Sequence, residues 1–221
     1  MVVSTAVSDL ALAIACAIGA AALLRASAAA DHPERALPRR VAAFAMATMA
    51  FAAALGSLRF AGLEQLTPLH RGSAHFAGAV APASFALVAL TAVVSGDRRR
   101  LSSLAIAGLA ILVLAWALFD PILQQGGLYR TAIGTPAVLL MVVLGLRDRS
   151  RPGLILAIGA LVLALAGLVI GSEGTIGPLL AVDVFHVALA LAHLAIAHGL
   201  IGLATSKDRA GNDPAGGLPS G

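Results

Sequence analysis

Residues 153–171 read GLILAIGALVLALAGLVIG and carry no charged side chain. A helix of about 20 apolar residues is long enough to cross the hydrocarbon core of a bilayer. The stretch therefore predicts a membrane-spanning helix. Within it, Gly167 and Gly171 form a GxxxG pair, which is typical of closely packed helices in membranes.

Six further stretches of the same character lie before and after it, separated by segments that contain Pro, Gly and charged residues. The full set covers residues 5–24, 41–58, 73–95, 101–119, 131–147, 153–171 and 179–203. Residues 205–221 are polar and rich in Gly and Pro, which predicts a disordered tail. We therefore expect an all-α polytopic membrane bundle of seven transmembrane helices, formed by a single domain over residues 1–204.

The composition supports a bilayer as the solvent of this chain. Of its 221 residues, 59% are hydrophobic and 12% are charged, and the mean hydropathy is +0.94. An ordinary soluble domain is about 45–50% apolar and about 25% charged. The net charge of +4 does not indicate nucleic-acid binding, because the basic residues lie between the apolar stretches and not on one face of a soluble domain.

The arginines indicate how the chain is threaded through the membrane. With seven alternating spans, one set of loops holds twelve of the fifteen Lys and Arg residues, and the other set holds Arg59, Arg71 and Arg130. Positively charged loops stay in the cytoplasm. We therefore expect a periplasmic or extracellular N-terminus and a cytoplasmic C-terminus, in a bacterial inner membrane.

Ionisable side chains within the apolar stretches need a physical reason, because each costs about 2.5–3.5 kcal/mol at the centre of a bilayer. The predicted topology places one set of polar and ionisable groups near the outer leaflet. These are Asp9, Arg59, His75, Asp120, Arg130, Asp183 and His186. We expect any chemistry of the protein to take place there.

Two interpretations of this set need no enzyme. In the first, Arg59, Asp120 and Arg130 belong to an ion-pair network that neutralises the carboxylates, with the histidines as hydrogen-bond partners. In the second, His75 and His186 bind a haem from facing helices. Their predicted depths differ by about three residues, or roughly 5 Å of helical rise, which a haem tolerates.

A third interpretation is a zinc site. Asp183 and His186 are three residues apart, so they share one face of a helix. Together with His75 they would hold the ion, which leaves a position open for water. Zinc activates such a water for attack on an ester or amide. In this hypothesis Asp9 belongs to the catalytic group, and Ser73 polarises the carbonyl or orients the water.

Two further residues lie deeper in the predicted bilayer. His193 stands alone near the middle of the last stretch, and we expect it to hydrogen-bond to a neighbouring helix. Cys16 is the only cysteine of the chain, so no internal disulfide can form.

Three segments together carry a resemblance to known proteins. They are Ser8-Asp9-Leu-Ala-Leu-Ala13, Arg71-Gly-Ser-Ala-His-Phe76 and Asp183-Val-Phe-His186. The chain resembles uncharacterised bacterial seven-helix membrane proteins and, more distantly, the superfamily of alkaline ceramidases and adiponectin-receptor-like hydrolases. The resemblance implies a zinc held by histidines of an early span and of the last span. Only His75 and His186 carry over, because that superfamily has two histidines four residues apart in its last span.

Two functions are therefore expected from the sequence. The first is a small structural or accessory membrane protein with a polar cluster at the outer leaflet. The second is a zinc-dependent hydrolase of a lipid-like amide or ester, and haem binding is a further alternative. The expected partners are the lipid bilayer and, for the hydrolase, a lipid-like substrate, whereas nucleic acid is not expected.

Overall fold

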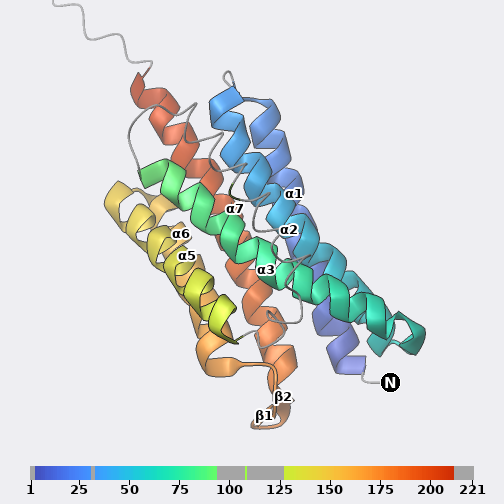
Figure 1. Ribbon diagram of the computed structural model, residues 1–221. Coiled ribbons are helices and arrows are strands. Elements are labelled where there is room, and N and C mark those ends of the chain that lie inside the picture. The colour runs from blue at the N-terminus through green and yellow to red at the C-terminus, as the bar shows by residue number, and fades with distance from the viewer. Residues whose placement is uncertain (1–2, 31–32, 94–107, 109–126, 212–221) are drawn as a thin grey trace, which may run out of the picture.

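The computed structural model describes residues 3–30, 33–93, 108 and 127–211. Over these residues the chain is a helical bundle, so the predicted all-α class is confirmed (Figure 1). The predicted span at 101–119 lies outside the described residues, apart from position 108. Helix α7 continues through residues 205–211, and residues 212–221 of the expected tail lie outside the described residues.

Six long helices make up the described bundle. They are α1 (Val3–Ala28), α2 (Pro33–Phe60), α3 (Thr67–Val93), α5 (Gly127–Asp148), α6 (Arg151–Leu165) and α7 (Ala181–Gly211). A 3₁₀ turn, η1 (Glu64–Leu66), precedes α3, and a π-helical turn, η2 (Ala166–Ile170), follows α6. Two short antiparallel strands, β1 (Thr175–Ile176) and β2 (Leu179–Leu180), form a hairpin just before α7.

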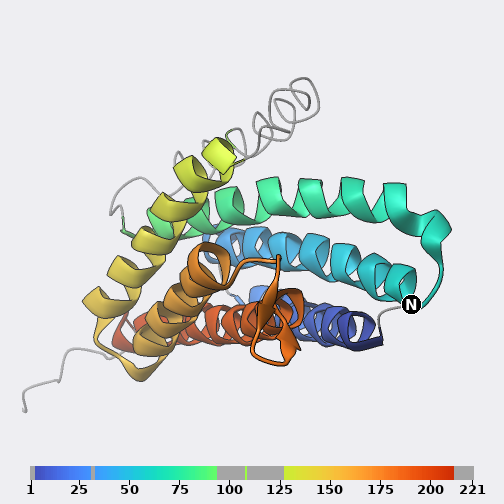
Figure 2. The ribbon, with the colours of Figure 1, turned by 90° about the horizontal axis from the view of Figure 1, so that it is seen from below.

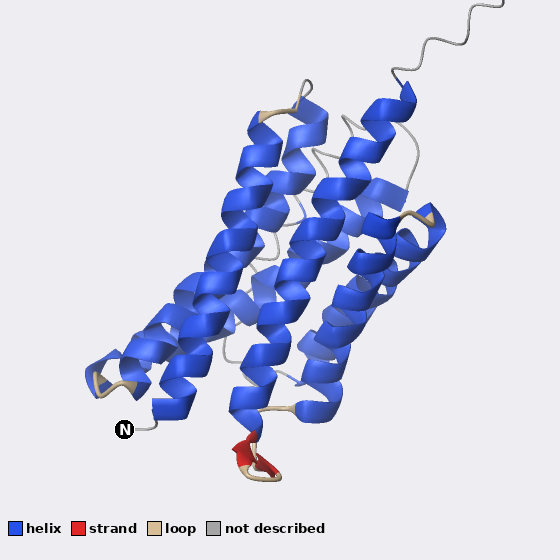
Figure 3. Cartoon of the chain, turned by 180° about the vertical axis from the view of Figure 1, so that it is seen from behind, coloured by secondary structure: helices blue, strands red, loops and turns tan. Residues whose placement is uncertain are grey.

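The helices pack as a closed ring. Among the described helices, each packs mainly against two neighbours in the order α1, α2, α3, α5, α6, α7, and α7 returns to α1 (Figure 2). A smaller contact joins α2 to α7. Helix α2 therefore lies between α1 and α3. The N-terminal ends of α1, α3 and α7 lie toward the same end of the bundle as the hairpin (Figures 1 and 3).

Five stretches of described helix are long and apolar enough to cross a membrane. They are Val3–Ala28, Ala36–Phe60, Glu64–Ala89, Arg151–Ile170 and Ala181–Leu203. Their outward faces carry large apolar side chains, such as Val7, Ile14 and Ile18 on α1. The interior instead holds many alanines together with polar groups. Large apolar groups outside and small or polar groups inside suit a bundle that is surrounded by lipid.

The α6–α7 contact depends on glycine, but not on the GxxxG pair. Among the described residues, a Cβ atom built on Gly167 or Gly171 would meet nothing within 4 Å, so this pair does not form the α6–α7 contact. The close approach lies elsewhere. A Cβ on Gly199 would lie 2.6 Å from Leu156 Cβ, and one on Gly159 would lie 2.8 Å from Ala195 Cβ. These glycines let the two backbones touch.

We expect Gly199→Ala to destabilise the bundle by about 1–3 kcal/mol, the usual cost of overpacking a core. The added methyl group would lie 2.8 Å from Leu156 Cα, and a backbone atom cannot rotate away from it. Thermal unfolding in detergent measures the effect. Gly167→Ala is the matched control, since its methyl group enters open space. Equal melting temperatures for the two variants would contradict this account of the α6–α7 contact.

Candidate functional site

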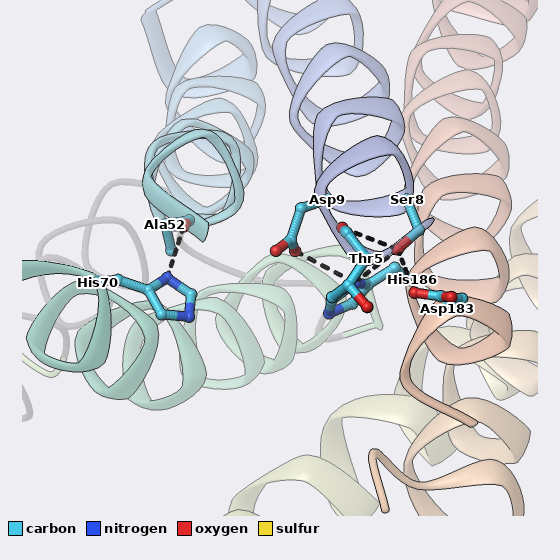
Figure 4. Close-up of polar contacts among 7 residues, drawn as sticks. All are labelled: Thr5, Ser8, Asp9, Ala52, His70, Asp183 and His186. Atoms are coloured by element: carbon cyan, nitrogen blue, oxygen red, sulfur yellow. Dashed lines mark hydrogen bonds and ion pairs between the residues drawn. The ribbon is translucent and has the colours of Figure 1, made fainter. Parts of the chain in front are cut away.

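Asp9 and His186 meet where α1 packs against α7. Asp9 Oδ1 lies 3.1 Å from His186 Nδ1, and the two side chains are 3% and 14% exposed, respectively. Both residues lie within the first two turns of their helices. The pair therefore joins two elements that lie far apart in the sequence (Figure 4).

Ser8 connects this pair to a second carboxylate. Its hydroxyl oxygen lies 2.9 Å from Asp183 Oδ1, 3.3 Å from His186 Nδ1 and 3.1 Å from the Thr5 carbonyl oxygen. When the Ser8 hydroxyl donates its proton to Asp183, the Ser8 oxygen can still accept a hydrogen bond from His186 Nδ1. The second turn of α1 thus supplies a hydroxyl donor to Asp183 of α7.

The second oxygen of Asp9 has no hydrogen-bond partner among the described residues, although it is buried. It faces α2 at Gly56. A Cβ atom built on Gly56 would lie 2.9 Å from both Asp9 Cγ and His70 Cε1, and it would collide with Asp9 Oδ2. Glycine therefore leaves room in α2 for side chains from α1 and α3 to approach one another. This oxygen is an unused acceptor inside the bundle.

His70 of α3 lies on the other side of Gly56. Its Nδ1 is 3.1 Å from the Ala52 carbonyl oxygen, so that nitrogen carries the proton and donates it. The ring packs edge-on against Phe60, with 6.4 Å between the ring centroids. In the neutral ring Nε2 is then an acceptor. The same holds for His186 when its Nδ1 donates to Asp9.

The charges of the cluster are unbalanced within the described residues. No Lys or Arg nitrogen in that part of the chain lies within 4 Å of Asp9 or Asp183. Arg59 acts on Asp9 only through longer-range electrostatics. Its guanidinium carbon lies 4.6 Å from the centroid of the Phe60 ring, which it covers. Within the described residues, the His186 imidazole is therefore the close basic neighbour of Asp9, and Asp183 instead accepts from Ser8.

The structure brings together three of the predicted site residues, namely Asp9, Asp183 and His186. His75 is exposed, and the Ser73 hydroxyl donates to the His70 carbonyl oxygen at 2.9 Å, so neither has a described contact with the cluster. The side chains of Asp120 and Arg130 lie outside the described residues.

Sequence reasoning missed Ser8, Gly56 and His70 as parts of the site. His70 had a detectable signal, since Thr67-Pro68 is a helix start that would place His70 in the first turn of α3. Five residues separate His70 from His75, which puts them about 140° apart around a helix. Only one of the two can face the bundle interior at this level.

The cluster is confined to one end of the bundle. One to two turns further along α1 the interior becomes apolar, with Leu12 and Cys16 buried against Met46 and their neighbours. His193 is also buried there and donates to the carbonyl oxygen of Leu189 in its own helix, at 2.7 Å. Its ring lies 5.9 Å from that of Phe85. This histidine bonds within α7 and not to a neighbouring helix as expected.

The geometry of the cluster can be compared with that of a Ser-His-Asp triad and with that of a metal site. A Ser-His-Asp triad needs the serine and the carboxylate on opposite ring nitrogens, whereas Ser8 and Asp9 both approach Nδ1 of His186. The described residues also contain no group of three or more His, Cys, Asp and Glu side chains placed to hold a metal ion. What they contain is a buried, unused carboxylate oxygen beside two oriented imidazoles.

Comparisons with known proteins give a family but no activity. No curated protein and no solved structure matches this chain. A family model matches residues 4–205, which covers every described helix apart from the first residue of α1 and the last turn and a half of α7. The chain is therefore a membrane-type helical bundle that belongs to the family of unknown function DUF6962.

Proposed function

We propose that this protein is an accessory membrane protein that binds a small cation at the Asp9 cluster and performs no chemistry of its own. The observation that carries the proposal is Asp9 Oδ2, which is buried without a hydrogen-bond donor. Burying an acceptor without a partner costs about 1–3 kcal/mol, and more when the group is charged. A bound cation would repay that cost.

The donor atoms near Asp9 suggest which cation fits. The carboxylate contributes a hard oxygen, and the Nε2 atoms of His70 and His186 are the acceptors of their rings. Each ring is held through Nδ1, one by a backbone carbonyl and the other by a carboxylate. Imidazoles that ligate metals are usually oriented in this way. Mixed oxygen and nitrogen donors favour borderline divalent ions such as Zn²⁺ over Ca²⁺ or Mg²⁺. In the described residues the three side chains do not already form a metal site, so binding would require them to move together around the ion.

Ion-dependent thermal unfolding of the purified protein tests the proposal. We expect Zn²⁺ or Co²⁺ at about 100 times its Kd to stabilise the protein by about 2.7 kcal/mol. Asp9→Asn should abolish that gain, because the amide oxygen carries no charge. Asp148→Asn is the matched control: Asp148 also has an unpartnered buried oxygen, but it ends α5 and lies outside the cluster. Absence of a gain with any ion, or an equal gain in Asp9→Asn, would overturn the proposal.

A second candidate is a zinc-dependent hydrolase of a lipid-like amide or ester. The orientation of His186 by Asp9 supports it, since a held imidazole can ligate zinc or accept a proton. Zinc-loaded protein that cleaves a fluorogenic lipid amide or ester, with cleavage lost in His186→Ala, would favour this function. Ion binding without turnover favours the accessory protein. An absorbance spectrum of the same sample tests the haem alternative.

For the membrane setting we propose a bacterial inner membrane, with the Asp9 cluster at the outer leaflet and the C-terminus in the cytoplasm. The uneven distribution of Lys and Arg over the loops supports this orientation. A reporter enzyme that is active only in the periplasm, fused after residue 207, should stay inactive. Activity in that fusion would reverse the orientation.

A further inference from the structure

A groove lies between α2 and α3, on a different part of their surface from the Asp9 cluster. Its volume is about 520 Å³, within the range of sites that hold small molecules. The walls include Phe51 and Leu69, which are more than half exposed on the outside of the bundle. Small residues at Ala47 and Gly72 contribute to its hollow shape.

The lining of the groove has no hydroxyl proton left to donate to a ligand. Only two of its lining side chains are polar, Thr48 and Ser73. Thr48 donates to the Ala45 carbonyl oxygen at 2.7 Å, and Ser73 donates to the His70 carbonyl oxygen at 2.9 Å. With both protons used within the helices, a hydrocarbon chain fits this surface better than a sugar or a peptide.

Arginine residues lie near the end of the groove, where they could bind an anionic group at the end of a hydrocarbon chain. Its residues on α3 begin at Pro68, in the first turn, so the groove reaches the end of the bundle. Arg59 and Arg71 lie on either side of the α2–α3 connection, and Glu64 is the only acidic residue between them in the sequence. Arginine pairs well with phosphate, because its planar fork of N–H groups matches the phosphate oxygens.

We propose that the α2–α3 groove is a binding site for one anionic phospholipid, with an acyl chain in the groove and the phosphate near Arg71. The surrounding bilayer would supply this occupant, since the groove has exposed apolar walls on two helices that are long and apolar enough to cross a membrane. The proposal does not depend on cation binding at Asp9. His70 and Ala52, which border that cluster, are not among the residues that line the groove.

Native mass spectrometry of the protein with added phosphatidylglycerol tests the site. We expect one lipid per chain to be retained, and Gly72→Leu to lower its occupancy about tenfold by filling the groove. A Cβ on Gly72 meets nothing within 4 Å, so the leucine enters the groove without disturbing helix packing. Gly78→Leu is the matched control, because it lies in the same helix, also has open space at Cβ and does not line the groove.

Two further variants separate the parts of the proposal. Ala47→Leu fills the groove from α2 and should reproduce the loss if Gly72→Leu fails to fold. Arg71→Gln should weaken phosphatidylglycerol but not phosphatidylcholine, and inorganic phosphate should not compete with the lipid. Equal lipid retention in the native chain, the groove-filling variants and Gly78→Leu would overturn the proposal. Competition by free phosphate would overturn the role of the acyl chain.

Discussion

Replacing His186 with leucine is expected to destabilise the protein by about 3 kcal/mol or more. The imidazole is the only side chain of the described residues within ion-pair distance of Asp9, whose own side chain is 3% exposed. Removing the imidazole leaves the buried Asp9 carboxylate without its hydrogen-bond donor, which costs about 1–3 kcal/mol and more when the acceptor is charged, whereas removing both partners can be nearly neutral. Unfolding in detergent, followed by circular dichroism, measures the loss.

The double variant Asp9→Leu with His186→Leu makes this prediction specific. It should be more stable than His186→Leu alone, because no unpaired carboxylate remains in the interior. His75→Leu is the control for removing a histidine, since His75 is exposed and should change stability by less than about 0.5 kcal/mol. A double variant no more stable than His186→Leu would show that the contact between Asp9 and His186 does not account for the loss of stability.

Replacing Gly56 with leucine should abolish ion-dependent stabilisation altogether. Even the Cβ of a side chain at this position would collide with the Asp9 carboxylate and with the His70 ring. These obstacles are the ends of side chains and not backbone, so Asp9 and His70 would be pushed apart while the helices remain paired. We therefore expect the ion response to disappear, with a stability loss of about 1–3 kcal/mol.

The same ion titration, performed on Gly56→Leu and on Gly78→Leu, measures this effect. Both substitutions place leucine in a helix interior in place of glycine, but only the first meets other side chains at Cβ. Gly78→Leu should keep the native ion response. A native response in Gly56→Leu would mean that the bound cation does not lie between Asp9 and His70.

The sequence predicts the helical class well, because long apolar stretches have few other solutions. It also draws attention to Asp9, Asp183 and His186, which the structure brings together, since ionisable residues in such stretches are conspicuous. It does not show which helices touch. That α7 lies beside α1, and that α2 separates α1 from α3, depends on packing between distant segments.

The sequence pointed to His75 and not to His70 because the start of the third helix was placed too late. The third span was expected to begin at residue 73, which left His70 in a loop and placed His75 one turn inside. The helix instead begins at Thr67, so the interior face at this depth belongs to His70. The earlier helix start adds the turn that contains His70, which lies about 140° around the axis from His75. Gly56 carries no chemical group of its own, so its role becomes visible only once its neighbours are placed.

The single cysteine has a practical consequence for finding the orientation of the chain. Cys16 is fully buried in the interior of α1, beyond the reach of maleimide reagents while the protein is folded. The folded native chain should therefore not react with thiol reagents, so Cys16 does not have to be replaced before a labelling experiment. One cysteine introduced at Leu179 in the hairpin, or at Arg149 in the α5–α6 turn, would report through an impermeant maleimide which end of the bundle faces outward.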